Sequence, residues 1–221
     1  MEYGACLAMQ RRIQTEVQAG GEDTILVVEH PPVATLGRRG EPGDVFDPTL
    51  PVFHIERGGK ATLHAPGQIV VYPIVHLGAG NRDVRAWVRH LEGFIHALLA
   101  EFGIASHTKV DLPGVWTDGS GKKIASIGIA VQRWVSIHGI AVNVTLAPQQ
   151  FERLDPCGLG AAVMTNMVLE GADVDVDTVR DWVLAHAAAH FVGFAKLFAI
   201  SDDTTKLESV PVEMNGLPNS N

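Results

Sequence analysis

The chain has 221 residues, a length that fits one large domain with its own buried core. Its net charge of −8 excludes a general nucleic-acid binder, because binding to phosphates needs a basic face. No apolar run reaches the roughly 18 residues of a membrane span, and residues 1–25 lack a signal-peptide core. We therefore expect a cytoplasmic protein. Two cysteines, Cys6 and Cys157, cannot build a disulfide framework or a zinc ribbon.

The first predicted element is an amphipathic helix over residues 3–19, with apolar side chains at helical spacing and a pair of glycines at its end. Strands are predicted at 24–30 and 52–57. The segment between them, 37–50, is rich in glycine, proline and charge, which is typical of a loop.

The middle of the chain alternates strands with one strong helix. An apolar strand is predicted at 68–76 and the clearest helix at 82–102. A short strand at 114–116 precedes two long ones, 124–134 and 135–145, which read as a hairpin. Neighbouring strands therefore look antiparallel, and the sequence predicts an α+β fold whose central mixed or antiparallel sheet is flanked by helices.

The C-terminal part is predicted to form a last helix, capped by Asp177 and continuing through Phe198. The polar composition beyond it is typical of a frayed end. We expect one domain over residues 1–202 and a flexible tail over 203–221.

Two side chains are candidates for nucleophilic chemistry. Cys157 lies in LDPCGLG, outside any periodic segment, and loops on rigid scaffolds often carry nucleophiles. Lys123 begins an apolar strand, where burial would lower its pKa and a nearby ammonium would favour a thiolate. The plainer alternatives are a small buried cysteine and a solvated lysine at a hairpin turn.

The stretch 57–68 combines glycines with Arg57, Thr62 and His64. Glycines let backbone approach a ligand closely, and the arginine and histidine could donate hydrogen bonds to a carbonyl or carboxylate. A long β-turn with His64 hydrogen-bonded in place is the alternative.

Searches for a phosphate loop and for a metal site both fail. The Gly-Lys pairs at 59–60 and 121–122 lack the remaining residues of a P-loop, so no nucleotide cofactor is predicted. His186 and His190 are four residues apart, but the glutamate of a zinc protease is missing from HAAAH. The sequence predicts no cofactor and no metal.

Basic residues lie in or beside these loops and strands despite the acidic total. If the segments converge, they form a positive rim that would attract an acidic partner; otherwise they scatter over the surface. The residues concerned are Arg38, Arg39, Arg57, Lys60, Lys122, Lys123 and Arg133.

Five ordered motifs give the chain a resemblance to the lipoyl(octanoyl) transferases, which share a fold with biotin and lipoate protein ligases. The resemblance runs from Tyr3 to Phe198. Its motifs are EHPPVATLGRR (29–39), RGGKATLHAPGQIVVYPI (57–74), PGVWTD (113–118), KIASIGIAVQRWVSIHGIAVNV (123–144) and PCGLGAAVMTN (156–166).

The resemblance implies roles for individual residues. Cys157 would be the acyl-thioester nucleophile, and Lys123 would lower the pKa of its thiol and help to move the proton. We expect their nitrogen and sulfur to lie within or slightly beyond hydrogen-bond reach. Backbone amides of glycine-containing strands would bind the oxyanion. The acyl site would be lined by Arg57, Gly58, Gly59, Lys60, Ala61, Thr62, Leu63 and His64, by Ser126, Ile127 and Gly128, and by Gly139, Ile140 and Ala141.

The implied reaction is the first step of endogenous protein lipoylation. The donor would be octanoyl-acyl carrier protein, which is acidic. The acceptor would be a lysine on the lipoyl domains of 2-oxoacid dehydrogenases or on the glycine cleavage H protein. A thioester donor is already activated, so no ATP is needed, and two half-reactions should give ping-pong kinetics.

The chain departs from the family at a few positions. Leu63 replaces a common aromatic residue, Ala65 a usual glycine, and Asn166 a usual serine. The chain also begins at the first helix, without the short strand that usually precedes it.

Three other functions remain open at this point. A related transferase would move octanoyl between two lipoyl domains, and a cysteine-dependent thioester hydrolase would pass it to water. A catalytically idle acyl-binding or carrier-binding protein on the same fold would not need Cys157.

Overall fold

The computed structural model describes residues 1–78, 82–110, 112–156, 158, 160–191, 196–199 and 208–209. Of the predicted tail, only 208–209 lies within this part. Among the described residues, no helix is both long and apolar enough to cross a membrane.

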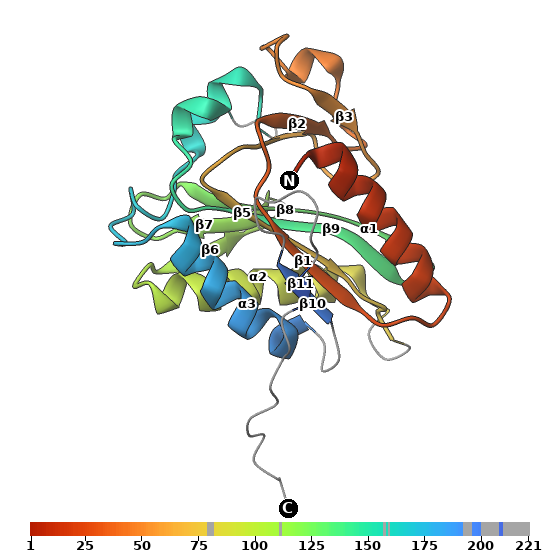
Figure 1. The fold of residues 1–221 in the computed structure, drawn as a ribbon. Coiled ribbons are helices and arrows are strands. Elements are labelled where there is room, and N and C mark those ends of the chain that lie inside the picture. Colours follow the sequence, from red (N-terminus) through yellow and green to blue (C-terminus); the bar gives the residue numbers. More distant parts are fainter. Residues whose placement is uncertain are drawn as a thin grey trace, which may run out of the picture.

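The core of the fold is a mixed eight-stranded sheet in the order β11-β10-β1-β5-β9-β8-β7-β6 (Figure 1). The pair β1–β10 is parallel and the other neighbours are antiparallel. The strands are β1 (Thr24–Val28), β5 (Gln68–Ile74), β6 (Ser106–Lys109), β7 (Leu112–Thr117), β8 (Lys123–Gln132), β9 (Val135–Asn143), β10 (Lys196–Ala199) and β11 (Glu208–Ser209).

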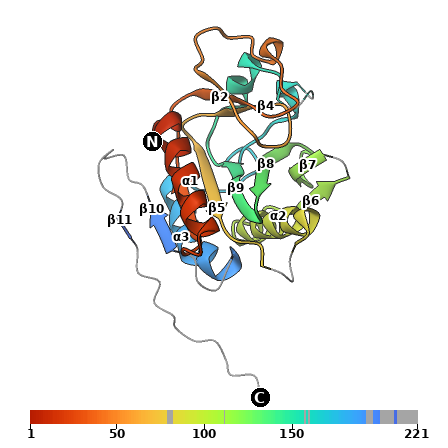
Figure 2. The same cartoon turned by 90° about the vertical axis from the view of Figure 1, so that its right-hand side faces the viewer.

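Alternation along the central strands divides the apolar side chains between two cores. In β1, Ile25 and Val27 pack with the helices α2 (Val84–Glu101) and α3 (Val176–Phe191) on one face. Leu26 and Val28 pack under α1 (Tyr3–Gln18) on the other. Because both faces are covered, β1 and β5 read as continuous apolar runs (Figure 2).

The helix α2 begins at a capped end and buries one face. The Asp83 carboxylate accepts hydrogen bonds from the backbone N–H groups of Arg85 and Ala86. The buried positions recur every three or four residues, so a single apolar stripe meets the sheet. They are Trp87, Leu91, Phe94, Ile95, Leu98 and Leu99.

A second, smaller sheet lies on the α1 side of the large one, in the order β3-β2-β4 (Figures 1 and 2). Its strands are β3 (Val52–His54), β2 (Val33–Leu36) and β4 (Ala61–His64). The sequence predicted only the first of these. The other two have four residues each and adjoin proline- or glycine-rich segments, so periodicity alone does not reveal them.

The C-terminal helix was predicted to end seven residues too late. The helix α3 ends at Phe191, and Lys196–Ala199 forms a strand beside β1 instead of continuing to Phe198. Its first turn is capped by Asp175, whose carboxylate accepts a hydrogen bond from Thr178 N–H at 2.8 Å. Asp177 lies inside that turn, so its predicted capping role is wrong.

Candidate active site

A pocket lies between the two sheets, on the α1 side of the large one. Its walls come from β5, β8 and β9 on one side and from β4 and the preceding 55–59 loop on the other, with Tyr3 of α1 completing them. The space between the walls, including open solvent at the mouth, is about 470 Å³.

Most of the predicted acyl-site residues meet at this pocket. They come from segments up to 84 positions apart in the chain, since Arg57 and Ala141 both contribute. The predicted residues that line it are Arg57, Gly58, Gly59, Thr62, His64, Ser126, Ile127, Gly128, Gly139, Ile140 and Ala141. Whether they bind an acyl chain stays a prediction.

Ala61 and Leu63 face away from the pocket. They occupy alternate positions of β4, so when Thr62 and His64 point to the pocket these two point to the opposite face. There they join the core beneath the small sheet, fully buried. They do not line this pocket, and their predicted place in the acyl site stays a prediction.

Lys60 lies beside the loop that carries the candidate nucleophile. Its side chain is partly exposed and its Nζ is 4.0 Å from Asp44 Oδ1. A Cβ built on Gly158 would lie 3.4 Å from the same Nζ. The ammonium therefore adjoins the 156–158 segment, outside the pocket walls.

Arg57 is buried and braces the small sheet. Its Nη2 donates to the backbone oxygen and the hydroxyl of Thr35 at 2.7 and 2.9 Å, and Nη1 donates to Gly58 O at 2.9 Å. Its stem crosses the large sheet at Gly128, where any Cβ would lie 2.7 Å from Arg57 Cδ. Gly128 is thus required for this side chain to form the pocket wall.

Lys123 is buried at the first position of β8, with 3% of its surface exposed. Its backbone oxygen accepts a hydrogen bond from Thr165 N–H at 3.0 Å. The side chain passes over Gly114 of β7, where a Cβ would lie 2.6 Å from Lys123 Cε and 3.2 Å from Nζ. A glycine at position 114 therefore makes room for the lysine.

Cys157 lies outside the described residues, so its predicted contact with Lys123 stays a prediction. The residues around it are placed: Pro156 forms a parallel bridge with Ala61. The second cysteine, Cys6, is fully buried in α1 and accepts a hydrogen bond from Gln10 Nε2 at 3.7 Å. Burial raises the pKa of the Cys6 thiol to about 12, which makes it a poor nucleophile.

Sequence reasoning missed several residues that line the pocket: Tyr3, Ile55, Val70, Tyr72 and His138. Two of these belong to an aromatic cluster with His30 and His64, in which His30 Nε2 and Tyr72 Oη are 2.9 Å apart. Alternation along 68–76 could have placed Val70 and Tyr72 on one face, but not which face meets a pocket.

His138 is held in an unusual backbone conformation. Its φ of 64° is left-handed, within a central strand, and its N–H donates to the buried Gln10 Oε1 at 3.2 Å. The ring is buried without a hydrogen bond to a described residue, and Nε2 lies 3.6 Å from Glu56 Oε2. Such strain is typical of functional sites. Burial lowers the pKa of His138 although Glu56 opposes it.

The two histidines of the cluster are held neutral. Burial lowers the pKa of His64 to about 3 and that of His30 to about 4. The pocket can therefore present imidazole nitrogens without a positive charge near an apolar ligand.

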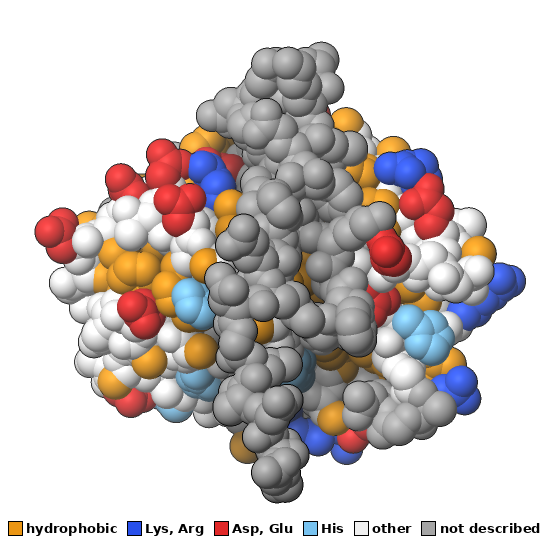
Figure 3. All heavy atoms as spheres, turned by 60° about the horizontal axis from the view of Figure 1, so that its bottom comes forward, with side chains coloured by type: hydrophobic (Ala, Val, Ile, Leu, Met, Phe, Trp, Pro, Cys, Tyr) orange, Lys and Arg blue, Asp and Glu red, His pale blue; other side chains and the backbone are white. Residues whose placement is uncertain are grey.

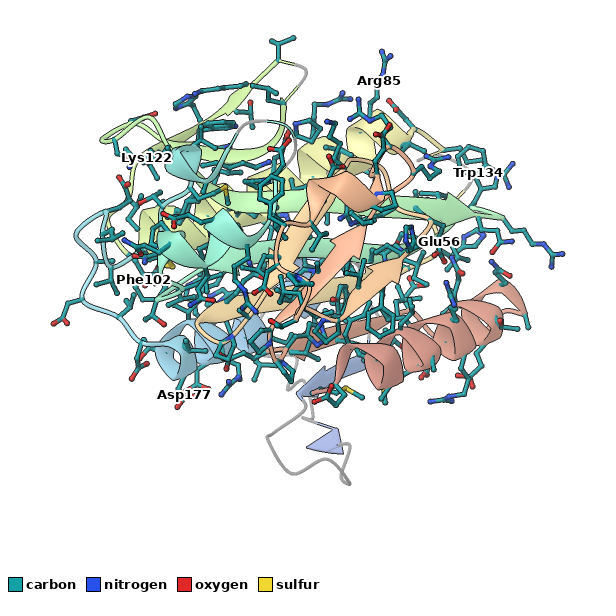
Figure 4. The ribbon with its side chains drawn as sticks, turned by 90° about the horizontal axis from the view of Figure 1, so that it is seen from above. Glu56, Arg85, Phe102, Lys122, Trp134 and Asp177 are labelled. Atoms are coloured by element: carbon teal, nitrogen blue, oxygen red, sulfur yellow. The ribbon has the colours of Figure 1, made fainter. Side chains whose placement is uncertain are left out.

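The seven basic residues of the predicted positive rim do not all converge. Arg57 and Lys123 are buried. Lys122 and Arg133 flank β8 at opposite ends, which a ten-residue strand places about 33 Å apart; Figure 4 shows Lys122 and Trp134 at opposite sides of the molecule. Where described residues are visible in Figure 3, Lys and Arg side chains are scattered among Asp and Glu side chains.

The histidines that were weighed as metal ligands have other contacts. His186 Nδ1 is 2.7 Å from Trp182 O, and His190 Nε2 is 3.0 Å from His90 O. Within the described ranges, no group of three potential ligands gathers.

A family model described as the lipoyl protein ligase A/B catalytic domain matches residues 2–188. The chain belongs to this family. An octanoyltransferase of Citrifermentans bemidjiense is 43% identical over 182 residues, 82% of this chain and 88% of that protein. One of Geotalea uraniireducens is 37% identical over 208 residues, 93% and 94% of the two chains.

Solved structures of lipoate-protein ligases share the fold of this family member. Lipoate-protein ligase A bound with ATP superposes with a TM-score of 0.71 at 15% identity, covering 89% of this chain and 83% of that one. A bipartite lipoate protein ligase from Thermoplasma acidophilum gives 0.68 at 13%, covering 88% and 83%. The predicted family, fold class and enzyme class, an acyltransferase, are confirmed.

The neutral histidines predict a loss of stability in acid. Because His30 and His64 have lowered pKa values in the folded state, the unfolded chain binds protons below pH about 6.5 that the folded protein does not, and the free energy of unfolding falls as the pH falls. We expect a loss on the order of 2 kcal/mol per histidine by pH about 5. Urea denaturation at pH about 8, where the histidines are neutral in both states, and at pH about 5 measures this loss of the free energy of unfolding. A His64→Gln variant should lose about half of this dependence, and equal stability of the wild type at both pH values would contradict the assignment.

Replacing Gly114 should destabilise the fold and displace Lys123. In Gly114→Ala the Cβ would lie 2.4 Å from Ala125 O and 2.6 Å from Lys123 Cε, at a φ of 122°. We expect a loss of about 2–4 kcal/mol in the free energy of unfolding, measured in urea. The matched control is Gly93→Ala in α2, which meets open space and should gain about 0.5–1 kcal/mol. A Gly114→Ala variant as stable as the control would refute the close approach.

Proposed function

We propose that the protein transfers an octanoyl group from octanoyl-acyl carrier protein to a lysine of a lipoyl-carrier domain, through a thioester on Cys157. The carrying observation is the pocket between the two sheets, one wall of which includes residues 126–128 of β8, the strand that begins with Lys123. That the acyl group is octanoyl is inferred from the relatives named octanoyltransferase.

The pocket walls suit a linear apolar chain. Ile55, Val70, Ile127, Ile140 and Ala141 contribute apolar surface to them, and burial of each methylene contributes about 0.8 kcal/mol. The glycines at 58, 59, 128 and 139 add no side chain to the walls. A backbone N–H that faces the thioester would stabilise the oxyanion of the tetrahedral intermediate, and it is not that of Gly58, which donates to Ile129 O at 3.0 Å.

In the first half-reaction, the Cys157 thiolate attacks the thioester carbonyl of the donor. A new C–S bond forms, the old one breaks, and the carrier thiol leaves with a proton. Lys123 supports this step because a buried ammonium near the sulfur favours the thiolate. Its amine can return the proton to the leaving thiolate.

In the second half-reaction, a neutral lysine amine of the acceptor attacks the thioester on Cys157. The C–N bond forms, the C–S bond breaks, and the amine proton passes to the departing thiolate. Because the acyl group is already activated as a thioester, neither half-reaction needs ATP.

The acceptor is inferred from the family. Relatives are named octanoyltransferase, and the ligase of Thermoplasma acidophilum was solved in work on that ligase and its E2 lipoyl domain. We propose lipoyl domains of 2-oxoacid dehydrogenases and the glycine cleavage H protein as acceptors, in the cytoplasm. The acidic donor would meet Lys60, the exposed cation beside the 156–158 segment.

The covalent intermediate is tested by intact mass. After mixing with octanoyl-acyl carrier protein, the wild type should gain one octanoyl group and lose it on addition of a lipoyl domain. The Cys157→Ala variant should gain none. Cys6→Ala is the matched control and should acylate like the wild type, since the Cys6 thiol is buried.

Each other outcome identifies a different mechanism. Octanoylated lipoyl domain without an enzyme adduct would mean direct transfer. Loss of the adduct to water in the presence of acceptor would mean a hydrolase, and loading from an octanoylated lipoyl domain alone would mean the related transferase. Unchanged function in Cys157→Ala would leave only an acyl-binding protein. Any of these would overturn the proposal.

A further inference from the structure

A chain of buried hydrogen bonds runs from the pocket wall to the strand of Lys123. His64 Nδ1 lies 2.7 Å from Gln68 Oε1, Gln68 Nε2 donates to Asn143 Oδ1 at 2.9 Å, and Asn143 Nδ2 donates to Thr165 O at 2.9 Å. Thr165 N–H in turn donates to Lys123 O at 3.0 Å. The three side chains, those of His64, Gln68 and Asn143, are buried. We call this chain of bonds the relay.

The hydrogen-bond donors and acceptors of the relay can be assigned in only one way. The carbonyl of Thr165 can only accept, so the Asn143 amide nitrogen must face it and Asn143 Oδ1 must face Gln68. Gln68 therefore turns its nitrogen to Asn143, where it also donates to Leu63 O at 3.3 Å, and its oxygen to His64. Because that oxygen can only accept, His64 Nδ1 must carry a hydrogen.

The neutral His64 is consequently restricted to one tautomer. With the hydrogen on Nδ1, Nε2 holds a lone pair and acts as an acceptor. The ring lines the pocket and stacks on Tyr3, with 5.8 Å between the ring centroids. Since isolated neutral imidazole can take either tautomer, the acceptor at Nε2 is a product of Gln68 and Asn143.

The relay reaches the end of β8 that begins with Lys123. Gln68 pairs with Asn143 at the end of β9, and that end adjoins the beginning of β8, because Ala125 pairs with Val142. Lys123 is two positions from Ala125. His64 is therefore fixed to the same piece of backbone that positions the lysine.

We propose that Gln68 and Asn143 are positioning residues that hold His64 as a hydrogen-bond acceptor for the attacking lysine amine of the acceptor domain. The inference rests on the proposed function. A neutral amine has two N–H groups and one lone pair, so an acceptor that holds one N–H points the lone pair at the carbonyl. The imidazole orients the amine and does not take its proton, which passes to the departing thiolate of Cys157.

The alternative role for the relay is only to join the two sheets. A structural link would not depend on which nitrogen of His64 carries the hydrogen, whereas an acceptor role does. The opposite tautomer would point an N–H at the N–H groups of the amine and would disfavour its approach.

The first test uses the wild-type protein. Two-dimensional ¹⁵N NMR of the imidazole groups, assigned with a His64→Gln variant, should show His64 with Nδ1 protonated and Nε2 bare at neutral pH. A hydrogen on Nε2 would overturn the proposal, and this measurement does not depend on any relay variant folding.

The second test changes the charge at Gln68. In Gln68→Glu a carboxylate next to the ring should stabilise the imidazolium, so that Nε2 becomes a donor at low pH. We expect discharge of the octanoyl-enzyme to a lipoyl domain to slow by about tenfold or more at pH about 6 and to recover as the pH rises. Acylation of Cys157 should change much less. The other titratable groups facing His64 stay in place: Tyr3, His30, Arg57, Tyr72 and His138.

The matched control is Gln14→Glu. Gln14 is also a buried glutamine whose Nε2 donates to a carbonyl, that of Val135 at 3.1 Å, and it lies in α1. It should keep the wild-type pH profile of discharge. A Gln68→Glu enzyme that discharges at the wild-type rate at every pH would overturn the proposal. If the wild type forms no octanoyl-enzyme, the proposed function fails instead, and the NMR result still decides the tautomer.

Discussion

The pocket depends on two glycines that pair with each other across the central strands β8 and β9. Gly128 and Gly139 are register partners in the β8–β9 hairpin. At Gly128 a side chain would collide with the stem of Arg57, and at Gly139 a Cβ would lie 2.1 Å from Val71 O. The first glycine admits the arginine that braces the small sheet, and the second lets β5 approach. A side chain at position 128 would displace the arginine, and one at position 139 would disturb the approach of β5 to β9.

The walls of that pocket combine apolar surface with histidines that carry no charge. Burial removes the charge from His30 and His64, as their lowered pKa values show. Neutral imidazoles can neighbour an acyl chain at little electrostatic cost and still offer directed hydrogen bonds. Positive charge comes from Arg57 in the pocket wall and from Lys123 at the first position of β8, where the proposed chemistry uses it.

Hydrophobic periodicity predicted the elements that are formed by contacts between residues close together in the sequence. The amphipathic α1 and α2 and the β8–β9 hairpin fall in this class, and the strands β1 and β5 show as apolar runs. Two strands of the small sheet, β2 and β4, escaped prediction because they are short and pair with each other only through tertiary contact. The strand β10 was taken for helix because apolar residues follow the alanine-rich segment on both sides of Gly193.

The sequence predicted which segments line the pocket, but not which of their side chains face it. Motifs placed 57–64 in the acyl site, yet only the discovery that 61–64 is a strand shows that Thr62 and His64 face the pocket while Leu63 does not. The seven basic residues of the predicted rim do not all converge, because sequence proximity to a motif says nothing about burial or about the two ends of a strand. His138 needed coordinates, since its left-handed φ leaves no mark in the sequence.

The central claim is that Lys123 activates Cys157, and the most direct measurement is the pH dependence of Cys157 alkylation by iodoacetamide. Cys6→Ala should serve as background so that one thiol is followed. The account predicts an apparent pKa below the usual value of about 8.5 for a free thiol, and a higher pKa when Lys123→Met is added. An apparent pKa that is the same with and without the lysine would contradict it.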